Sequence, residues 1–490
     1  MRKQIVSIYG LFFIVILTIL SGCMVGPDYS RPETAAETSD VYYNAGKHDQ
    51  DVNDFSEVDR WWEQFGDPIT TTLVRDSLEN NYSLKAAAAR VLQAQAALTE
   101  IHGRRLPDIS YNLNRDRSKR SFNFGGFAGG GRFTVMTTTW QQDITVAYIL
   151  DLFGKLKRSE RAAWNELLAS EANEQVLINS MIATVINARV DIATLQRRLA
   201  IARANTESQR KTLEIVERRY EQGLVGPVDI RLARENLAAL EGLEPVIELS
   251  LITARNALDE LLARRPGSSD ELPQTLDDLP DLGPIPVGLP ASLLDRRPDV
   301  RAAELMLRAA NERIGVSIAQ LYPDLNIIGT FGYSGDTVEE IFQQDETEMY
   351  MAIMSLAQPI FRGGQIRAQI DAAEARYAEL AANYAGTVLT AMREVEDALI
   401  TEKMLQTQLK YARVQFREAS AAESLSKQRY ERGVEGILTV LESERRRRIS
   451  EQEMTILKGQ IWTTRVNLFL ALGGDWDYQE SSEEQVALSE

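Results

Sequence analysis

The longest regular pattern in the chain is a seven-residue repeat of apolar positions. It runs without a proline from about Lys155 to Glu221. The repeating residues are Ile178, Val185, Ile192 and Leu199, followed three positions later by Met181, Ala188, Leu195 and Ala202. Such a seam predicts a long helix that packs in a coiled coil. At 1.5 Å per residue this helix would extend roughly 100 Å, although a soluble helical bundle would show the same pattern.

Two stretches, at 109–114 and 325–334, alternate between apolar and polar residues, as β-strands do. Their apolar members are Ile109, Tyr111, Leu113, Leu325, Ile327, Phe331 and Tyr333. A second, weaker β-rich segment follows each stretch. The sequence therefore predicts four strands, at about 108–122, 132–148, 324–335 and 349–360. Strands of about ten residues with aromatic side chains are typical of a membrane β-barrel, and a small soluble hairpin is the alternative.

The same order of motifs occurs twice. LPDISYNLN (106–114) corresponds to YPDLNIIGTFG (322–332), and LDLFGKLKRSERAA (150–163) corresponds to QPIFRGGQIRAQIDAA (358–373). RYEQG at 219–223 returns 210 positions later as RYERG. The offsets of the three motif pairs are nearly equal, which indicates an internal duplication.

Each copy has the same predicted order of elements: a helix, two strands, a very long helix, an Arg-Tyr-x-x-Gly break and another helix. The first copy covers 68–263 and the second covers 291–472, with opening helices at 68–103 and 297–320. The segment between the copies, 264–290, is dense in proline and glycine. That composition predicts a linker on the outside of the body.

The first 22 residues predict an export signal. An Arg-Lys pair precedes a long apolar run, and the motif LSGC ends at Cys23. A basic start, an apolar core and a small-residue end are typical of a signal peptide, and an uncleaved membrane anchor is the alternative. The residues before Cys23 look like a bacterial lipobox, in which the chain is cut and the cysteine thiol is acylated, for example with palmitate. By the same similarity, Met24 suggests the outer membrane as the destination.

The composition argues against several functions. The 490 residues carry a formal charge of −17, which disfavours a nucleic-acid partner. Cys23 is the only cysteine, and His48 and His102 are the only histidines. No Cys/His metal cluster or catalytic constellation can be assembled from them. We expect no cofactor other than the lipid on Cys23, and we do not expect an enzyme.

The number of strands raises a geometric problem. Four strands cannot close a barrel, and an open sheet edge in lipid leaves backbone groups without hydrogen bonds. Bacterial barrels have about eight strands or more. Two chains would supply eight strands and three chains twelve, so strands that enter a membrane predict an oligomer.

Further motifs lie outside the periodic segments: GCMVGPDYSRP (22–32), WWEQFGDP (61–68) and VGLPASLLDRRPDVRAAE (287–304). With the PDL, PIF and Arg-Tyr-x-x-Gly segments of the two copies, they resemble the outer-membrane factors. These are the TolC-like exit ducts of tripartite efflux pumps, and the similarity is to the NodT-type lipoproteins of RND systems. It covers nearly the whole mature chain.

The resemblance implies a homotrimer in the outer membrane. The fold would be mainly α, with a twelve-stranded membrane β-barrel continued by a long α-helical barrel in the periplasm. The arm 23–67, the linker 264–290 and the tail 473–490 would form an equatorial belt. The duct would passively conduct drugs or other small molecules outward. Its partners would be a periplasmic adaptor (membrane fusion) protein and an inner-membrane RND-type pump.

The resemblance also implies that the two Arg-Tyr-x-x-Gly breaks are turns at the inner tip of the helical barrel, where the adaptor docks. Glycine would allow the chain to reverse there. The residues expected at these docking tips are Tyr220, Gly223, Leu224, Gly433 and Val434.

The same family places a periplasmic gate beside the second break. Leu438 and Glu442 would face the pore, with Thr439 and Arg445 nearby. Three copies of Glu442 would form a carboxylate ring, which favours cations in a narrow aqueous constriction. The alternative for Glu442 and Arg445 is an ordinary surface pair three residues apart on one helix.

Two further gate features follow from the resemblance. Tyr430 and Asp229 would tether neighbouring coils, with Arg445 as a second tether. The chain departs from the family's reference duct at Glu435, where that duct has an arginine, and at Thr439, where it has an aspartate. A lock that uses the arginine is therefore not expected.

Two other functions remain compatible with these patterns. One is the outer-membrane duct of a type I protein secretion system. The other is a lipid-tethered periplasmic coiled-coil scaffold without a pore.

Overall fold

The structure, a computed structural model, describes residues 24–34, 42–44, 60–123, 132–268, 272, 296–342 and 347–474. The predicted signal peptide, Cys23, His48, and most of the linker 264–290 and of the tail 473–490 lie outside the described residues.

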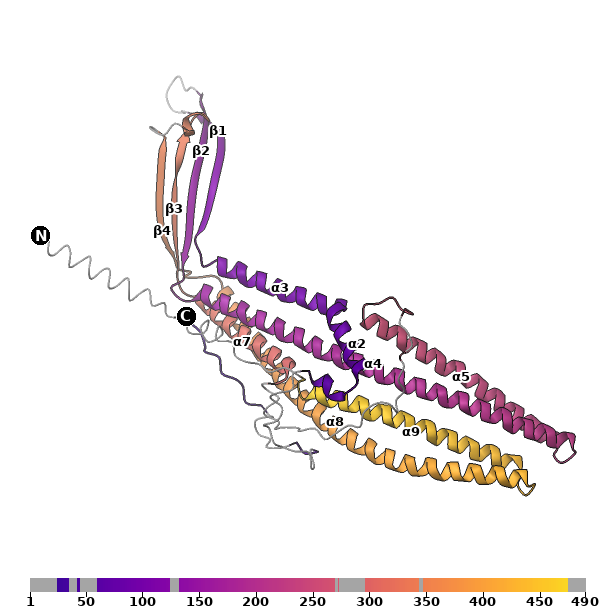
Figure 1. Cartoon of the computed structure of the whole chain (residues 1–490). Helices are drawn as coiled ribbons and strands as arrows, with labels where there is room; N and C mark the ends of the chain where they lie inside the picture. Colours follow the sequence, from indigo (N-terminus) through magenta and orange to yellow (C-terminus); the bar gives the residue numbers. More distant parts are fainter. Residues whose placement is uncertain are drawn as a thin grey trace. The chain divides into compact units, whose positions relative to one another are not determined.

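Four antiparallel strands form one sheet in the order in which they occur along the chain (Figure 1). They are β1 (Asp108–Asn123), β2 (Arg132–Leu150), β3 (Asp324–Gly335) and β4 (Glu348–Ala357). The β2–β3 register runs from Trp140 opposite Gly335 to Leu150 opposite Leu325, so the two sequence copies share one sheet. Within the described residues β1 pairs only with β2 and β4 only with β3. Each outer strand therefore has one open backbone edge.

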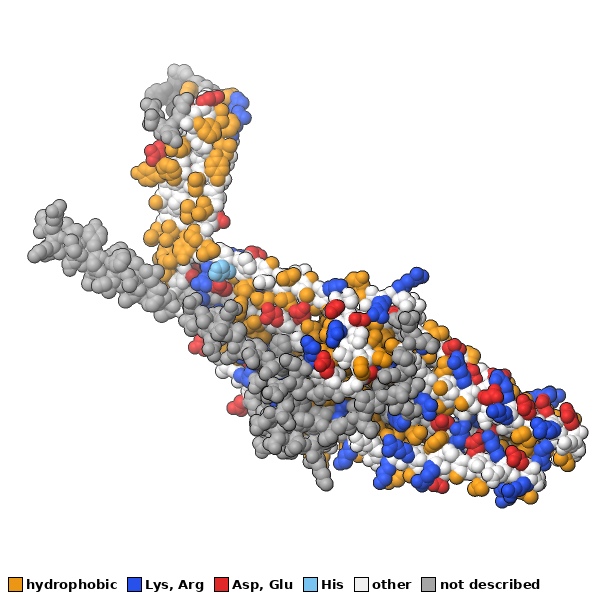
Figure 2. Space-filling model, viewed as in Figure 1, with side chains coloured by type: hydrophobic (Ala, Val, Ile, Leu, Met, Phe, Trp, Pro, Cys, Tyr) orange, Lys and Arg blue, Asp and Glu red, His pale blue; other side chains and the backbone are white. Residues whose placement is uncertain are grey.

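One face of the sheet, called the apolar face below, is hydrophobic on all four strands. Paired residues share a face because successive side chains of a strand point to opposite sides. The side chains on the apolar face include Ile109, Tyr111, Leu113, Ile144, Val146, Phe331, Tyr350, Met354 and Leu356, each more than a third exposed. Figure 2 shows hydrophobic side chains along the sheet. Exposed apolar groups on every strand indicate a surface that meets lipid or another protein.

The opposite face, called the polar face, is rich in hydroxyl and amide groups. Its centre is Asp143, which accepts hydrogen bonds from Asn112 Nδ2 (3.0 Å), Gln141 Nε2 (3.0 Å) and Thr145 Oγ1 (2.9 Å). The alternation is weakest in β4, which adds Met351 and Ile353 to this face. A sheet with one apolar and one polar face is the pattern of a wall between lipid and water.

The helices of the two copies match in length. The first copy contains α2 (Pro68–Asn80), α3 (Tyr82–Gly103), α4 (Lys155–Glu221) and α5 (Pro227–Leu261). The second contains α7 (Pro298–Ala319), α8 (Gln365–Glu431) and α9 (Ile437–Ala471). α4 and α8 each have 67 residues, and α5 and α9 each have 35. Within α4, one stretch is apolar enough to cross a membrane, but most of it is buried, as in a core helix.

The opening helix of the first copy is not the single helix expected over 68–103. It breaks at Asn81, where α2 ends and α3 begins. The Asn81 side-chain oxygen accepts hydrogen bonds from the backbone N–H groups of Ser83 and Leu84, at 2.8 and 3.3 Å. Its amide nitrogen donates to the carbonyl oxygen of Leu261 at 2.8 Å. This contact with the end of α5 fixes a cap that the local sequence does not require.

The chain divides into two compact units. The first contains the sheet and the neighbouring helix segments, within Val91–Ser170 and Ala303–Asn383. The second contains the remaining helical segments and both turns between long helices. α4 and α8 contribute residues to both units.

Two of the family-like motifs fold as packed segments of these units. In the second unit WWEQF forms the 3₁₀ helix η2 (Trp61–Phe65). Trp61 stacks on Phe469 of α9 with ring centroids 5.3 Å apart, and Phe65 lies 5.4 Å from Trp462. Asp67 then caps α2 through the backbone N–H groups of Ile69 and Thr70.

In the first unit the segment Met24–Pro32 lies against α4 and α7, and we call it the N-terminal strap. The Val25 N–H donates to the carbonyl oxygen of Phe153 at 3.2 Å. The buried guanidinium of Arg158 donates to the carbonyl oxygen of Pro27 at 3.2 Å. Because Phe153 follows the last residues of β2, the strap begins beside the end of the sheet.

Candidate functional site

The two Arg-Tyr-x-x-Gly breaks form the same turn between long helices. Gly223 has a φ of +71° and Gly433 a φ of +77°, the left-handed region that favours glycine. In the first turn the N–H of Leu224 donates to Arg219 O and that of Gly223 donates to Tyr220 O, both at 2.9 Å. The second turn repeats both bonds from Val434 and Gly433. This is the Schellman motif, which ends a helix by satisfying its last carbonyl groups.

Both turns expose apolar side chains. Leu224 and Val434, one in each turn, leave 62% and 64% of their surface exposed. Tyr220 is 43% exposed, whereas its counterpart Tyr430 is only 4% exposed. The five residues expected at the docking tips therefore all lie in the two turns or on the adjoining helix ends. The tips present hydrophobic groups to solvent, as a protein-docking surface does.

Tyr430 joins the two hairpins at their tips. Its ring packs in an apolar cluster with Val216, Ala233, Ile437, Val440 and Leu441. The guanidinium of Arg219 lies 4.5 Å from the ring centroid and also donates a hydrogen bond to the Tyr430 carbonyl oxygen. Burial raises the pKa of the Tyr430 phenol, with Arg219 opposing this rise and Asp229 adding to it.

The structure does not join Tyr430 and Asp229 by a hydrogen bond. The Tyr430 hydroxyl is buried without a hydrogen-bond partner among the described residues. The Asp229 carboxylate instead accepts the N–H of Gly226 at 3.3 Å and caps the start of α5. In this chain, Arg219 and not Asp229 makes the contact with Tyr430.

The expected gate residues lie together on one surface of α9. Leu438, Thr439 and Glu442 line a groove with Arg446 and with two small residues of α8, Ala419 and Ala422. Leu438 is 64% exposed. The Thr439 hydroxyl donates to Glu435 at 3.0 Å, and Arg429 Nε donates to the same carboxylate at 3.2 Å. Glu435 therefore stabilises the second turn in the place where the family's reference duct has an arginine.

Glu442 is held by two arginines of its own helix. Arg445 donates through Nε and a terminal nitrogen at 2.8 and 2.9 Å, and Arg446 Nε donates at 2.8 Å. These bonds to Arg445 and Arg446 lower the pKa of Glu442 to about 2. In the single chain Glu442 therefore has two cations beside it, and the carboxylate ring expected from the sequence stays a prediction. The surface-pair alternative describes the Arg445 contact in this chain.

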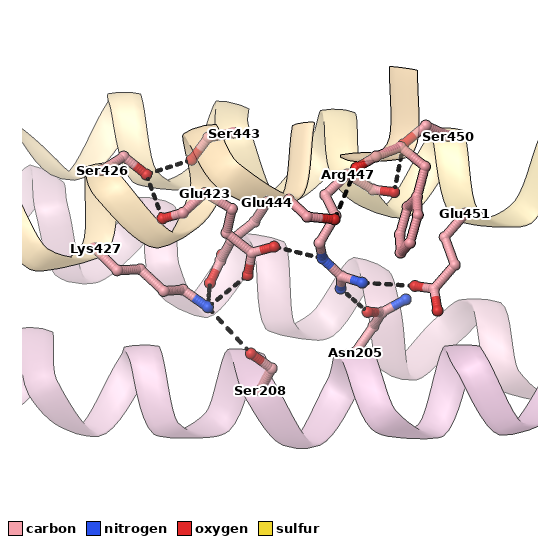
Figure 3. A network of polar contacts seen from close by, with 12 residues as sticks. Asn205, Ser208, Glu423, Ser426, Lys427, Ser443, Glu444, Arg447, Ser450 and Glu451 are labelled. Carbon is pink, nitrogen blue, oxygen red and sulfur yellow. Dashed lines mark hydrogen bonds and ion pairs between the residues drawn. The ribbon is translucent and has the colours of Figure 1, made fainter. Parts of the chain in front are cut away.

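A network of buried polar side chains lies further along the same helices (Figure 3). It joins α4, α8 and α9 through Asn205, Ser208, Thr212, Glu423, Ser426, Lys427, Ser443, Glu444, Arg447 and Glu451. Lys427 Nζ lies 2.7 Å from Glu423 and 2.8 Å from Glu444. Arg447 pairs with Glu423 and with Glu451, and also donates to Asn205 of α4.

The network is enclosed by protein. Glu423 is 8% and Glu444 3% exposed. Burial acts to lower the pKa of Lys427, but its bonds to Glu423 and Glu444 outweigh burial and raise that pKa. Buried charges of this kind are tolerated only when they are paired, and removal of one partner is costly. The network therefore fixes how α9 lies against α8 and α4.

The first copy has an apolar seam where the second copy has this network. At positions 210 residues earlier, Glu423, Ser426, Ser443, Arg447 and Ser450 are replaced by Leu213, Val216, Ala233, Leu237 and Leu240. One ion pair is conserved in position but reversed in sign: Glu217–Arg234 (2.7 Å) is exposed, and Lys427–Glu444 (2.8 Å) is largely buried. The two hairpins thus share length and turn but differ inside.

Sequence reasoning missed Arg446, Arg219 and the network. For Arg446 a signal was present, since Glu442 is followed three and four positions later by arginines, the spacing of helical ion pairs. The comparison of the two copies could also have shown Glu423, Ser443 and Arg447 at positions where the first copy is apolar. The contacts that join α4 to α8 and α9 depend on residues more than 200 positions apart, and no local pattern reveals them.

A sheet with one apolar face and two open edges, joined to long paired helices with exposed tips, is the fold of an outer-membrane channel. Residues 73–264 and 289–474 match the model of the outer membrane efflux protein family, and the chain belongs to this family. The resemblance to the outer-membrane factors is confirmed.

Individual relatives agree over nearly the full length. The outer membrane protein OprJ of Pseudomonas aeruginosa is 30% identical over 96% of both chains. The toluene efflux pump outer membrane protein TtgF of Pseudomonas putida is 29% identical, covering 95% of this chain and 96% of its own. The solved structure of the outer-membrane channel OprN matches with a TM-score of 0.85 at 28% identity, covering 93% of this chain and all of its own. These similarities confirm the expected fold.

The buried network gives a prediction for Glu444→Gln. The substitution keeps the shape of the side chain but leaves Lys427 and Thr212 without their carboxylate partner. We expect a cost of about 1–2 kcal/mol. Amide hydrogen exchange along α9 near residue 444 should then accelerate by roughly 5–30-fold.

Arg234→Gln is the matched control, because Arg234 occupies the equivalent place in the exposed pair of the first copy. It should change exchange in α5 by less than about twofold, as exposed ion pairs contribute little. Equal effects of the two substitutions would show that the network does not hold α9.

Proposed function

We propose that the chain is the exit duct of a tripartite efflux pump, that it works as a homotrimer, and that it passively conducts small molecules across the outer membrane. The observation that carries the proposal is the sheet: four strands with an exposed apolar face and an unpaired edge on both β1 and β4. A sheet in hydrocarbon must close on itself, because no water is present to hydrogen-bond its edges.

Closure by β1 of one chain pairing with β4 of the next satisfies every edge. Three chains give twelve strands, which meets the size of bacterial barrels. In that barrel the apolar face points to lipid and the polar face, with Asp143, lines the aqueous lumen. The membership of the chain in an efflux-channel family favours this arrangement over a scaffold without a pore.

The long helices carry the duct into the periplasm. Each chain supplies the pairs α4–α5 and α8–α9, so three chains supply twelve helices and six tips. The exposed apolar residues of the tips, Leu224 and Val434 among them, fit a protein partner. We assign that partner as the periplasmic adaptor, which in turn binds an RND-type inner-membrane pump that supplies the energy.

The position of the N-terminal strap supports a lipid anchor at the end of the sheet that leads into the long helices. Met24 packs on Gly154, which lies four residues after the end of β2 and has a φ of +74°. Cys23 precedes Met24, so acyl chains on Cys23 would lie at the end of the sheet from which α4 begins. An anchor there holds the barrel and the lipid in the same membrane.

Relatives with efflux names, such as the toluene efflux pump protein TtgF, favour efflux over protein secretion. Among the residues that the structure describes, we find no feature that selects one cargo. Selection would then be made by the inner-membrane pump, and the duct would contribute a wide aqueous path with a gate around Leu438 and Glu442.

The proposed gate gives a prediction for ion selectivity in planar bilayers. In the wild-type channel Arg445 and Arg446 offset Glu442, so its ring should not favour cations. The double variant Arg445→Gln/Arg446→Gln leaves three uncompensated carboxylates, and its cation-to-anion permeability ratio, from reversal potentials, should rise several-fold. The charge-matched control, Arg231→Gln/Arg234→Gln on α5, should leave the ratio unchanged.

The pH dependence follows from the pKa of Glu442. In the wild type this pKa is lowered to about 2, so selectivity should stay constant from pH 7 to pH 4. In the double variant the pKa returns toward its ordinary value of about 4.3, and the gained cation preference should fade as the pH drops through that value. A wild-type protein that forms no channel would contradict the duct, and an unchanged ratio in the double variant would place Glu442 outside the pore.

The proposed docking site gives a prediction for the glycines of the two turns. Gly223→Ala and Gly433→Ala force a side chain into the left-handed region at a cost of about 1–2 kcal/mol each, although open space surrounds Gly223. We expect the double variant to lose co-purification with its adaptor by fivefold or more while keeping its oligomeric mass. Gly226→Ala is the control in the same turn, because Gly226 has an ordinary φ of −85°. Normal adaptor recovery by the double variant would argue against docking at these turns.

A further inference from the structure

The apolar face of the sheet has aromatic residues near both of its ends. In β2, Tyr148 lies on this face toward the end of the strand that leads to α4. Trp140 lies on it toward the pair Asn123–Arg132, and we call that end of the sheet the distal end. The two residues are eight positions apart, roughly 27 Å along the strand. Tyr333 of β3 adds an aromatic group near the level of Trp140, whereas Tyr350 of β4 lies level with Ile144, midway between Trp140 and Tyr148. Aromatic residues that flank an apolar band mark the two membrane–water interfaces of a barrel.

Three cations continue the apolar face beyond its distal aromatic residues. Arg115, Arg117 and Lys119 occupy alternate positions of β1, so all three share the face that carries Trp140. We call these residues the basic stripe. Arg115 is paired with Trp140, and its guanidinium lies 5.3 Å from the centroid of that ring. The stripe therefore starts at the level of the distal aromatic residues and extends roughly 13 Å further along the strand.

The basic stripe is exposed and carries uncompensated charge. All three side chains are exposed. No ion pair or hydrogen bond joins them to a carboxylate within the described residues. Figure 2 shows Lys and Arg side chains at the distal end of the sheet, next to hydrophobic groups. Their charge is available to a partner outside the chain.

Three of the four cations of β1 lie on the apolar face, and the fourth, Arg120, lies on the polar face. At the same level the polar face carries Asn114, Asp116 and Ser118. The second copy has no such stripe, since the positions 216 residues later are Phe331, Tyr333 and Gly335. The stripe thus belongs to the longer first hairpin only. A strand charged merely to keep its edge soluble would have no reason to place three of its four cations on the apolar face.

We propose that the basic stripe binds the phosphate groups of an anionic glycolipid in the outer leaflet of the outer membrane. This inference rests on the proposed insertion of the sheet with its distal end outward. Arginine and lysine bind phosphate through charge-assisted hydrogen bonds, and the side chains of the stripe are spaced about 7 Å apart along the strand. The stripe lies just beyond the apolar band, at the depth where lipid headgroups meet water.

The binding has a physical consequence for the channel. Each cation near an anionic lipid surface contributes about fivefold to affinity at low salt, and this contribution falls with ionic strength. Three chains would present nine cations in a ring around the barrel, each stripe on the lipid-facing side. Glycolipid bound there would surround the distal part of the barrel and hold it at a fixed depth.

The test uses the purified, lipidated full-length protein in detergent, with lipid A carrying two phosphates and the same glycolipid without phosphates as probes. Retained glycolipid is measured by native mass spectrometry. The wild type should retain the phosphorylated form and lose it as salt is raised. Arg117→Gln should weaken retention about fivefold, and Arg115→Gln/Arg117→Gln/Lys119→Gln about a hundredfold.

Two controls test whether binding needs a positive charge on the apolar face of β1 or only a positive charge anywhere on this strand. Arg120→Gln removes a cation from the polar face of the same strand and should change retention by less than twofold. Arg117→Lys keeps the charge and should restore most of the binding. Equal loss in Arg117→Gln and Arg120→Gln, or equal retention of the two glycolipids by the wild type, would overturn the proposal.

Bilayer conductance of the same variants keeps the two proposals apart. The stripe variants should conduct like the wild type, because the cations face away from the lumen. Absence of conductance in the wild type would count against the duct itself, whereas normal conductance with unchanged glycolipid retention would count against the basic stripe alone.

Discussion

The open edges of β1 and β4 are the constraint on which the rest of the molecule depends. Each backbone N–H or C=O group left unpaired in hydrocarbon costs several kcal/mol, so a four-stranded sheet cannot remain alone in a membrane. The ten residues of β4 and the membrane-level half of β1 must pair with strands of other chains. The closed barrel and the lumen that Asp143 would face then follow from this one requirement for backbone hydrogen bonds.

The internal duplication supplies two hairpins of equal length to each chain. The two hairpins differ in the residues that pack inside them. Both copies keep helices of 67 and 35 residues and the same glycine turn. Their interiors differ: the first copy has the apolar residues Leu213, Val216 and Leu237 at the positions where Glu423, Ser426 and Arg447 of the second copy take part in a polar network. Apolar contacts stabilise helix packing without a strict requirement on geometry. In a buried ionic network the loss of one side chain leaves its partners unpaired and costs stability. The residues proposed for the gate, Leu438 and Glu442, lie on the hairpin that carries the network.

The sequence predicted the features that repeat and missed those that depend on distant residues. The heptad pattern from Lys155 to Glu221 and the two Arg-Tyr-x-x-Gly turns have local causes: apolar spacing, and a glycine with a left-handed φ. The break at Asn81 was missed although asparagine is a favoured N-cap and its side chain caps Ser83 and Leu84; only its second contact, with the carbonyl group of Leu261 180 residues away, has no signal in the local sequence. Glu442 was assigned to a pore from family resemblance, but its charge state is set by Arg445 and Arg446 on its own helix.

The central claim is that β1 and β4 close a barrel between chains, and the most direct measurement is backbone hydrogen exchange of the lipidated protein in lipid bilayers, together with its mass in detergent. The account predicts three chains per particle. It also predicts that amide protons of β1 and β4 at membrane depth exchange as slowly as those shared by β2 and β3. A monomeric particle, or fast exchange confined to β1 and β4, would contradict it.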